Sequence, residues 1–305
     1  MDPVIASRGA GVAEGTPPLR SPRLVGCILT RNEERNIQRA VCSLDGVAEA
    51  VFVADSESTD STAEIAAGAG ATVVVHPFES FPAQRNWALD EIADRFGDVW
   101  VLSIDADEWV SDGLAASLKE LLPALGRDAD VYQVKLRRRF AGRILRHGGF
   151  GHTTLTRLMP ARGPRYEGRD VNEHLALPGT ARIGGVDGWL EHGDADSWES
   201  YIDKHNRYST FEAEARVATG REHRVTSAEA RADPSLRKRF LRQHLWDRLP
   251  PGLRPALRFV QIFVVFAGFL DGNAGFRRAL FEAWQEMCTD LKEERLRQVR
   301  EGQQR

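Results

Sequence analysis

The stretch VWVLSIDADE at positions 99–108 joins an apolar run to an acidic turn, and it decides the fold. Residues 99–104 read as a buried strand, and Asp105 and Asp107 follow it with Glu108 beside them. Alternate residues of an extended chain project to the same side, so both aspartates can face one ligand. Oxygen ligands of this kind suit Mg2+ or Mn2+ bridging phosphate oxygens, which favours a nucleoside diphosphate as the ligand. The alternative is a solvated acidic turn after a strand.

Short apolar runs alternate with helical patterns around this stretch. Strands are predicted at residues 24–30, 50–54, 72–76 and 99–104. Between them, apolar residues at helical spacing follow position 37, Asp60 can cap a helix, and Pro82 can open another that runs to residue 96. Alternation of this kind predicts an α/β fold with a mostly parallel sheet and right-handed crossovers.

Polar clusters directly follow three of the predicted strands, at residues 30–34, 55–60 and 105–108. Ligands of such sheets bind beyond the carboxyl ends of the strands, so all three clusters are expected to meet at one crevice. Neither a G-x-G-x-x-G motif after the first strand nor a G-x-x-x-x-G-K-[ST] motif is present. Glycine-loop amides are therefore not expected to hold the phosphates, and a metal on the acidic motif is the natural counter-charge.

The composition fits a globular chain with an ordinary core. The chain has 305 residues, 42% of them hydrophobic, and its 41 basic against 44 acidic residues give a net charge of −3, so nucleic acid is not an expected partner. Three scattered cysteines fit a reducing compartment, and the expected localisation is cytoplasmic. Residues 1–22 lack the apolar core of a secretory signal and read as a disordered leader.

Helix and strand alternation weakens after residue 122. Residues 131–140 read as a basic strand, residues 151–192 as short strands and loops, and residues 198–218 as a helix. Residues 237–258 hold seven basic residues against one acid, and the apolar run 259–270 follows. That run is too short to span a bilayer of about 30 Å. It is either a core helix with a solvated basic neighbour or a contact with the inner face of a membrane.

The ordered motifs resemble those of the inverting glycosyltransferases of family 2, which have the GT-A fold, and in particular the branch similar to lipopolysaccharide-core β-glucosyltransferases. The first four are VGCILTRNEE (25–34), ADSESTDST (54–62), QRN (84–86) and LSIDADE (102–108). Later ones are FAGR (140–143) with GG (148–149), VNEHL (171–175), LEH (190–192), HNRYST (205–210) and GFLDG (268–272). The resemblance covers residues 23–295. It implies a Rossmann-like sheet flanked by helices, with a catalytic domain at 23–218 and a helical C-terminal region at 219–305 that contacts a membrane or a second copy.

The resemblance also assigns the donor site. It implies that the nucleotide-sugar is bound by Thr30, Asn32, Glu33, Asp55, Gln84, Arg85, Asn86 and Asp105. Asp107 is the implied ligand of Mn2+ or Mg2+. For Asp60 a helix cap is preferred over a ligand role, and for Arg85 pairing with a surface acid is the alternative to phosphate contact.

An inverting transfer needs a carboxylate that takes the acceptor's proton on the face opposite the departing diphosphate. Glu173 is the implied base and Asp170 its nearest competitor. Relatives carry Val-His-Glu where this chain has Val-Asn-Glu, so the role of Asn172 stays open. His192 is either a structural histidine or a further metal ligand.

Two further features are weighed against the family pattern. Relatives have Gly where this chain has Glu57, so a turn with positive φ would strain that residue. The polar run that begins at His205 is expected to brace a helix, with acceptor contact as the alternative.

The expected activity is transfer of a hexosyl unit from a nucleotide-sugar, with UDP favoured, to a hydroxyl of a glycan, a lipid-linked glycan or a small molecule. A sugar-nucleotide nucleotidyltransferase is the second enzymatic hypothesis, but it usually carries a glycine-rich basic loop after the first strand. A nucleotide-sugar-binding scaffold is the non-enzymatic one.

Overall fold

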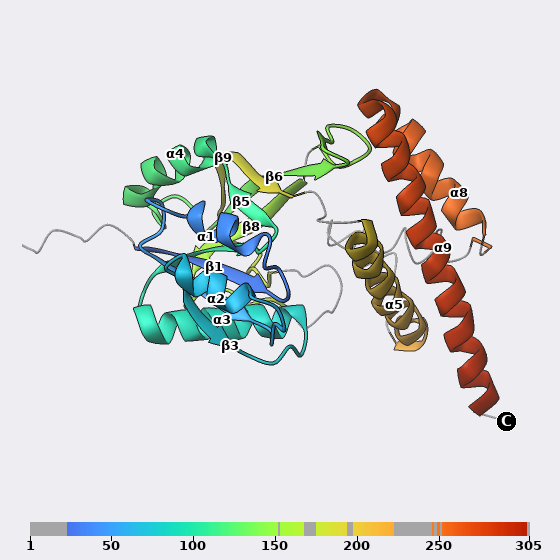
Figure 1. Ribbon diagram of the computed structural model, residues 1–305, viewed down its shortest axis with the longest axis horizontal. Helices are drawn as coiled ribbons and strands as arrows, with labels where there is room; N and C mark the ends of the chain where they lie inside the picture. Colours follow the sequence, from blue (N-terminus) through green and yellow to red (C-terminus); the bar gives the residue numbers. More distant parts are fainter. Residues whose placement is uncertain are drawn as a thin grey trace, which may run out of the picture.

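A computed structural model describes residues 23–151, 153–167, 175–193, 198–222, 246, 249–250 and 252–303 of the chain. A central sheet with helices on both faces forms one part of this structure, and a group of C-terminal helices lies beside it (Figure 1). The predicted α/β class with a helical C-terminal region is confirmed.

Four parallel strands form the first half of the sheet, in the order β3-β2-β1-β4. Their bounds agree with the predicted strands to within a residue at each end: β1 is Leu24–Thr30, β2 is Ala50–Asp55, β3 is Thr72–Val75 and β4 is Trp100–Asp105. Nearly every side chain of β1 and β4 is buried, as expected for parallel strands covered on both faces.

Helices cover both faces of these strands. Helices α1 (Ile37–Cys42), α2 (Thr62–Gly68) and α4 (Asp112–Leu121) join one apolar core, and α3 (Phe81–Phe96) joins the other. The start of α3 was predicted from Pro82, which lies in its first turn, and the Ser80 hydroxyl caps it by accepting from the Ala83 amide at 3.3 Å.

The second half of the sheet is mixed, which the alternation of elements did not predict. It continues from β4 through β8 (Thr153–Pro160), β6 (Val131–Phe140) and β9 (Ile183–His192) to β5 (Glu108–Val110). β7 (Arg143–Ile144) pairs with β6 alone. β8 runs antiparallel to both of its neighbours, whereas β6 and β9 are parallel. Because β5 follows β4 directly in sequence, the acidic turn joins the parallel half of the sheet to its far edge.

The C-terminal helices are α5 (Trp198–Glu222), α8 (Leu253–Val260) and the long α9 (Gly272–Gln303). A π-helical turn, η3 (Gln261–Val265), and a 3-10 turn, η4 (Gly268–Asp271), connect α8 to α9. The apolar run 259–270 is thus split among three elements rather than forming one helix. Among the described residues no single helix is long and apolar enough to cross a membrane, and α8–η3 with α9 satisfies that test only as a pair bent by 72°.

Buried ion pairs join these helices. Arg216 of α5 donates to Glu286 of α9 at 2.8 Å, and Arg254 of α8 donates to Asp290 and Glu293 at 2.8 and 3.2 Å. Arg258 pairs with Glu282 at 2.9 Å. The two described arginines at the end of the predicted basic stretch are therefore neutralised by acids of α9, and five of its seven basic residues lie outside the described part of the chain.

Candidate active site

The three polar clusters lie together at the carboxyl ends of β1, β2 and β4, as predicted. The register pairs Thr30 with Asp55 across β1 and β2, and Leu29 with Asp105 across β1 and β4. The first two clusters bond to each other, because the Asn32 amide donates to the Ser58 hydroxyl at 2.9 Å and the Thr59 amide donates to the Asn32 side chain at 2.8 Å. The loops after β1 and β2 therefore form one hydrogen-bonded unit.

Glu33 and Asp60 help to hold this unit together. The Glu33 amide donates to the Thr62 hydroxyl at 2.8 Å, and the Glu33 carboxylate accepts from the Asn36 side chain at 2.9 Å. Asp60 accepts from the Thr62 amide at 3.0 Å, which satisfies an amide in the first turn of α2. The N-cap residue of α2 is Ser61, whose side chain makes no capping bond, so Asp60 supports the helix start from one position earlier than predicted.

Asp55 is 2% exposed and anchors the second loop. Its carboxylate accepts from the Ser58 amide at 3.0 Å and from the Ser58 hydroxyl at 2.5 Å. A carboxylate has about four lone-pair sites, so these bonds leave acceptor capacity for a ligand group. The buried Thr30 hydroxyl has no hydrogen-bond partner among the described residues, which marks the end of β1 as a place where a ligand atom can complete the bonding.

Two residues of this unit have left-handed backbones, Asn32 with φ +56° and Glu57 with φ +57°. Asn adopts this conformation readily, but a glutamate pays a steric cost there. The turn around Glu57 thus keeps the positive φ that suits the glycine of relatives, which confirms the strain expected from sequence.

Asp105 lies between two arginines. Arg85 of α3 donates to Oδ1 at 2.8 Å, and Arg157 of β8 donates to Oδ2 at 2.9 Å. Burial alone would raise the pKa of Asp105, but the charges of Arg157 and Arg85 hold the pKa far below its ordinary value. Arg85 is 6% exposed and also donates to the Ser103 hydroxyl at 2.9 Å. The acid with which it pairs is Asp105 of the acidic turn, and its contact with a phosphate stays a prediction.

Glu108, the first residue of β5, completes this arrangement of charges. It is 2% exposed, accepts from Arg157 at 2.9 Å, and accepts from the Asp105 amide at 3.0 Å. Burial raises its pKa despite the opposing charge of Arg157. Glu108 therefore shapes the turn rather than facing a ligand. Arg157 was not predicted from the sequence, although an arginine followed by apolar residues within a strand can mark a buried ion pair.

Asp107 faces away from the arginines, toward His192 and α5. Its Oδ2 lies 2.9 Å from Lys204 Nζ and 3.7 Å from His192 Nε2. Burial would raise the pKa of Asp107, but the neighbouring His192 and Lys204 lower it below its ordinary value. Nothing in the sequence pattern pointed to Lys204, because it is 97 residues away along the chain.

The donor set at Asp107 fits a divalent cation. His192 Nδ1 lies 3.0 Å from the Gly193 carbonyl, which can only accept, so Nδ1 donates and Nε2 is directed toward Asp107. A backbone carbonyl commonly orients a metal-binding histidine in this way. Among the described residues, no group of three or more His, Cys, Asp or Glu side chains is arranged so that it could hold a metal ion by itself. Mg2+ and Mn2+ need only one or two protein ligands when substrate phosphates and water supply the rest.

Gln84 and Asn86, which were predicted to contact the donor, form hydrogen bonds with other parts of the protein. The Gln84 amide is 1% exposed and bonds to the His76 ring at 2.9 Å. Asn86 donates to the Tyr166 carbonyl at 3.0 Å and accepts from the Tyr166 amide at 2.8 Å. Both side chains hold neighbouring segments in place, and their predicted nucleotide contacts remain predictions.

The candidate bases lie outside the described residues. Glu173 and Asp170, with Asn172, fall in residues 168–174. Near the two ends of this segment, Tyr166 and Leu175 pair with each other as an isolated antiparallel bridge.

Comparison with known proteins identifies relatives of this chain. The sequence profile described as Glycosyl transferase family 2 matches residues 27–177. An uncharacterized glycosyltransferase of Rickettsia bellii (strain RML369-C) is 37% identical over 119 residues, which is 39% of each chain. This chain thus spans about two fifths of that relative's length. The lipopolysaccharide core biosynthesis glycosyltransferase LpsC of Rhizobium meliloti (strain 1021) is 30% identical over 216 residues, covering 65% of this chain and 73% of LpsC.

Solved structures of other proteins are similar to this chain over part or most of its length. Glucosyl-3-phosphoglycerate synthase from Mycobacterium tuberculosis, in complex with Mn2+, UDP and glucosyl-3-phosphoglycerate, is 27% identical with a TM-score of 0.31, over 39% of this chain and 44% of that one. TarS 1-349 from S. aureus is 16% identical with a TM-score of 0.43, over 91% of this chain and 92% of that one.

Proposed function

Because this chain belongs to glycosyltransferase family 2, we propose that it transfers a hexosyl unit from a nucleoside-diphosphate sugar, with UDP as the favoured nucleotide, to a hydroxyl acceptor with inversion. The observation that carries the proposal is the separation of roles within the acidic turn. Arg85 and Arg157 hold Asp105, whereas Asp107 faces His192 and Lys204. Two carboxylates one residue apart thus face two different environments.

Asp107 and His192 would hold Mn2+ or Mg2+ together with diphosphate oxygens of the donor. When bound, the cation acts as a Lewis acid that stabilises negative charge on the departing diphosphate. The paired loops that contain Asn32 and Asp55 would bind the nucleoside. Arg85 and Arg157 keep Asp105 ionised and fixed in orientation, so the donor binds beside an anchored carboxylate rather than a mobile one.

The acceptor half of the reaction needs a base, for which Glu173 is proposed and Asp170 is the alternative. The carboxylate takes the proton of the acceptor hydroxyl while the oxygen of that hydroxyl forms a bond to the anomeric carbon. The bond between that carbon and the diphosphate oxygen breaks on the opposite face, and the electron pair leaves with the diphosphate. One displacement of this kind inverts the anomeric centre.

A lipid-linked glycan is the proposed acceptor. Support comes from LpsC, whose name assigns it to lipopolysaccharide core biosynthesis and of which this chain covers 73%. The scattered cysteines fit a cytoplasmic enzyme, because disulfides do not persist in that compartment.

The test is incubation of the full chain with UDP-glucose, other UDP-hexoses and GDP-mannose in the presence of Mn2+. Slow release of free sugar and nucleoside diphosphate supports the transferase. Pyrophosphate-dependent formation of a nucleoside triphosphate supports the nucleotidyltransferase, and donor binding without turnover supports the scaffold.

Two variants locate the chemistry. Asp107→Asn is expected to lower Mn2+-dependent turnover by about a hundredfold, while Asp45→Asn on the exposed surface leaves it unchanged. Glu173→Gln is expected to lower turnover with donor affinity retained. Near-normal turnover of Glu173→Gln contradicts its assignment as the base.

A further inference from the structure

The connection between α8 and α9 exposes an unusual run of large apolar side chains. Five residues within positions 264–270, here called the apolar tip, are Val264, Val265, Phe266, Phe269 and Leu270, with exposed fractions of 56, 68, 44, 50 and 61%. Soluble surfaces carry single apolar residues, but a contiguous cluster at the end of a helix pair marks an interaction site.

The apolar tip is a built turn rather than a loose end. Ala267 has a left-handed backbone with φ +56°, and Gly268 approaches the Ile262 carbonyl so closely that an added Cβ would lie 2.7 Å from its oxygen. Within the same turn Ile262 is 2% exposed, and the ring centroid of Phe263 lies 5.7 Å from that of Phe276 of α9. The turn therefore directs some apolar residues into the helix pair and leaves the tip residues outside.

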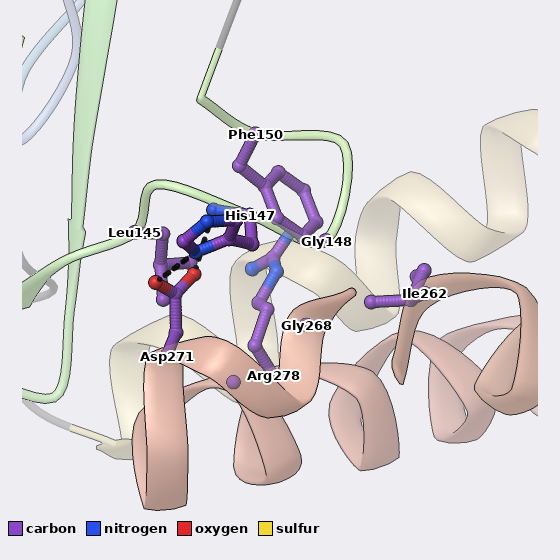
Figure 2. Close-up of a pocket in the computed structure, with 9 residues that line it drawn as sticks. Leu145, His147, Gly148, Phe150, Ile262, Gly268, Asp271 and Arg278 are labelled. Atoms are coloured by element: carbon purple, nitrogen blue, oxygen red, sulfur yellow. Dashed lines mark hydrogen bonds and ion pairs between the residues drawn. The ribbon is translucent and has the colours of Figure 1, made fainter. Parts of the chain in front are cut away.

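A loop of the catalytic part is fastened beside the tip, as Figure 2 shows. The Asp271 carboxylate accepts from the amides of Arg146 and His147 at 3.0 and 2.8 Å, and from His147 Nδ1 at 2.9 Å. The Gly148 amide donates to the carbonyl of Phe266, a tip residue, at 2.8 Å. The Arg278 guanidinium lies 4.7 Å from the centre of the Phe150 ring. These contacts fix the loop that follows β7 against the tip.

Two arginines flank this contact, Arg143 in β7 and Arg146 in the fastened loop itself. Arg143 and Arg146 are exposed, and neither side chain has an acidic partner among the described residues. Arg254 and Arg258, by contrast, are neutralised by acids of α9. Unpaired cations at the edge of exposed apolar residues match a surface that offers both phosphate groups and hydrocarbon.

We propose that the apolar tip, with Arg143 and Arg146, docks on the surface of an anionic lipid bilayer. A second copy of this chain is a poorer occupant, because a symmetric contact would bring the same unpaired arginines of two copies together. The inference rests on the proposed function in one respect, since it supplies the surface at which a lipid-linked acceptor is presented. The apolar tip lies within the run 259–270 for which a membrane contact was expected, but the cations beside it are Arg143 and Arg146 rather than the basic residues of 237–258.

The test is co-sedimentation of the full chain with vesicles of phosphatidylcholine, with and without phosphatidylglycerol. The double variant Val265→Ser with Phe269→Ser is expected to weaken binding to anionic vesicles about tenfold or more. Its control is Val75→Ser, an apolar residue of β3 that is 60% exposed at the edge of the sheet. Donor hydrolysis without vesicles is expected to stay unchanged in both variants, so a failed transferase assay and a failed docking assay are separate results.

A second variant tests the contribution of the positive charges of Arg143 and Arg146. Arg143→Gln with Arg146→Gln is expected to weaken binding about fivefold per arginine at low salt, since one basic residue near an anionic surface contributes about 1 kcal/mol. Arg127→Gln, another exposed arginine, is the control and leaves binding unchanged. Binding of the tip variant equal to that of the unaltered chain overturns the proposal, as does failure of the unaltered chain to bind. A concentration-dependent dimer that the tip variant abolishes would also overturn it and would assign the tip to self-association.

Discussion

Lys204 Nζ lies 2.9 Å from Asp107 Oδ2, so a lysine of α5 neutralises the carboxylate that is proposed to hold the metal. The charge of Asp107 raises the pKa of Lys204 well above its ordinary value even though burial opposes the shift. The ammonium is therefore a resident cation, and a divalent ion that binds Asp107 competes with it.

Replacing Lys204 with Met is expected to tighten Mn2+ binding to the donor-free protein by about tenfold, because a like charge beside the cation is removed. Titration of the protein with Mn2+, followed by calorimetry or by the paramagnetic signal of free Mn2+, measures the affinity. Lys119→Met on the exposed face of α4 serves as the control. Equal or weaker Mn2+ binding by Lys204→Met would show that the two cations do not compete.

Arg157 offers a sharp test of the buried charges. Replacing it with Gln leaves Asp105 and Glu108 without their shared cation, and the expected loss in the free energy of unfolding is about 3 to 5 kcal/mol. The same change at Arg162, which is 58% exposed and lies 3.5 Å from its acidic partners, is expected to cost less than about 1 kcal/mol. Chemical denaturation of both variants gives the comparison, and similar losses would contradict the buried network.

His205 predicts a pH dependence of stability. Burial lowers the pKa of His205 to about 4, although its bond to Gln285 at 2.7 Å acts in the opposite direction. Between pH about 6.5 and about 4 the unfolded chain binds a proton that the folded chain does not. The free energy of unfolding is therefore expected to fall as the pH is lowered through this window. His205→Asn is expected to show a shallower fall in denaturant titrations, and identical slopes would refute the assignment.

The backbone at Glu57 predicts a substitution that stabilises the fold. Glu57→Gly relieves a left-handed conformation and is expected to raise the free energy of unfolding by up to about 1 kcal/mol. Glu64→Gly, a change at another exposed glutamate, inside α2, is expected to lower the free energy of unfolding by about 1 kcal/mol. Thermal unfolding of the pair distinguishes them, and a loss at both positions would mean that the turn does not strain Glu57.

Local sequence patterns predicted much of this fold because the parallel half of the sheet is formed by strands that follow one another along the chain with helices between them. β1, β2 and β4 are each an apolar run followed by a polar cluster, and the capping residue of α3 lies next to its start. The convergence of the clusters then followed from a general rule of parallel sheets. The antiparallel insertion of β8 could not be predicted, because pairing between distant strands leaves no periodic signal of its own.

In the candidate site, too, the residues that are close in sequence were predicted and those that come from distant segments were not. Asp105 and Asp107 were identified because they are adjacent to each other and to a strand. Arg157 and Lys204 were missed because each reaches the acidic turn from a distant part of the chain, 49 residues after Glu108 and 97 residues after Asp107. Gln84 and Asn86 were expected at the nucleotide from their motif, but a motif does not reveal which neighbouring backbone groups compete for an amide.

Helix α5 has two contacts that connect distant parts of the molecule. Its Lys204 bonds to Asp107, and its Arg216 bonds to Glu286 of α9 at 2.8 Å. The position of the ammonium thus depends on how α5 packs against α9, so α9 affects the candidate metal site through α5. Metal affinity at Asp107 and the stability of the α5–α9 contact are therefore thermodynamically linked. A metal ion that displaces Lys204 is expected to change the stability of the α5–α9 contact, and truncation of α9 is expected to change the affinity of Asp107 for the metal ion.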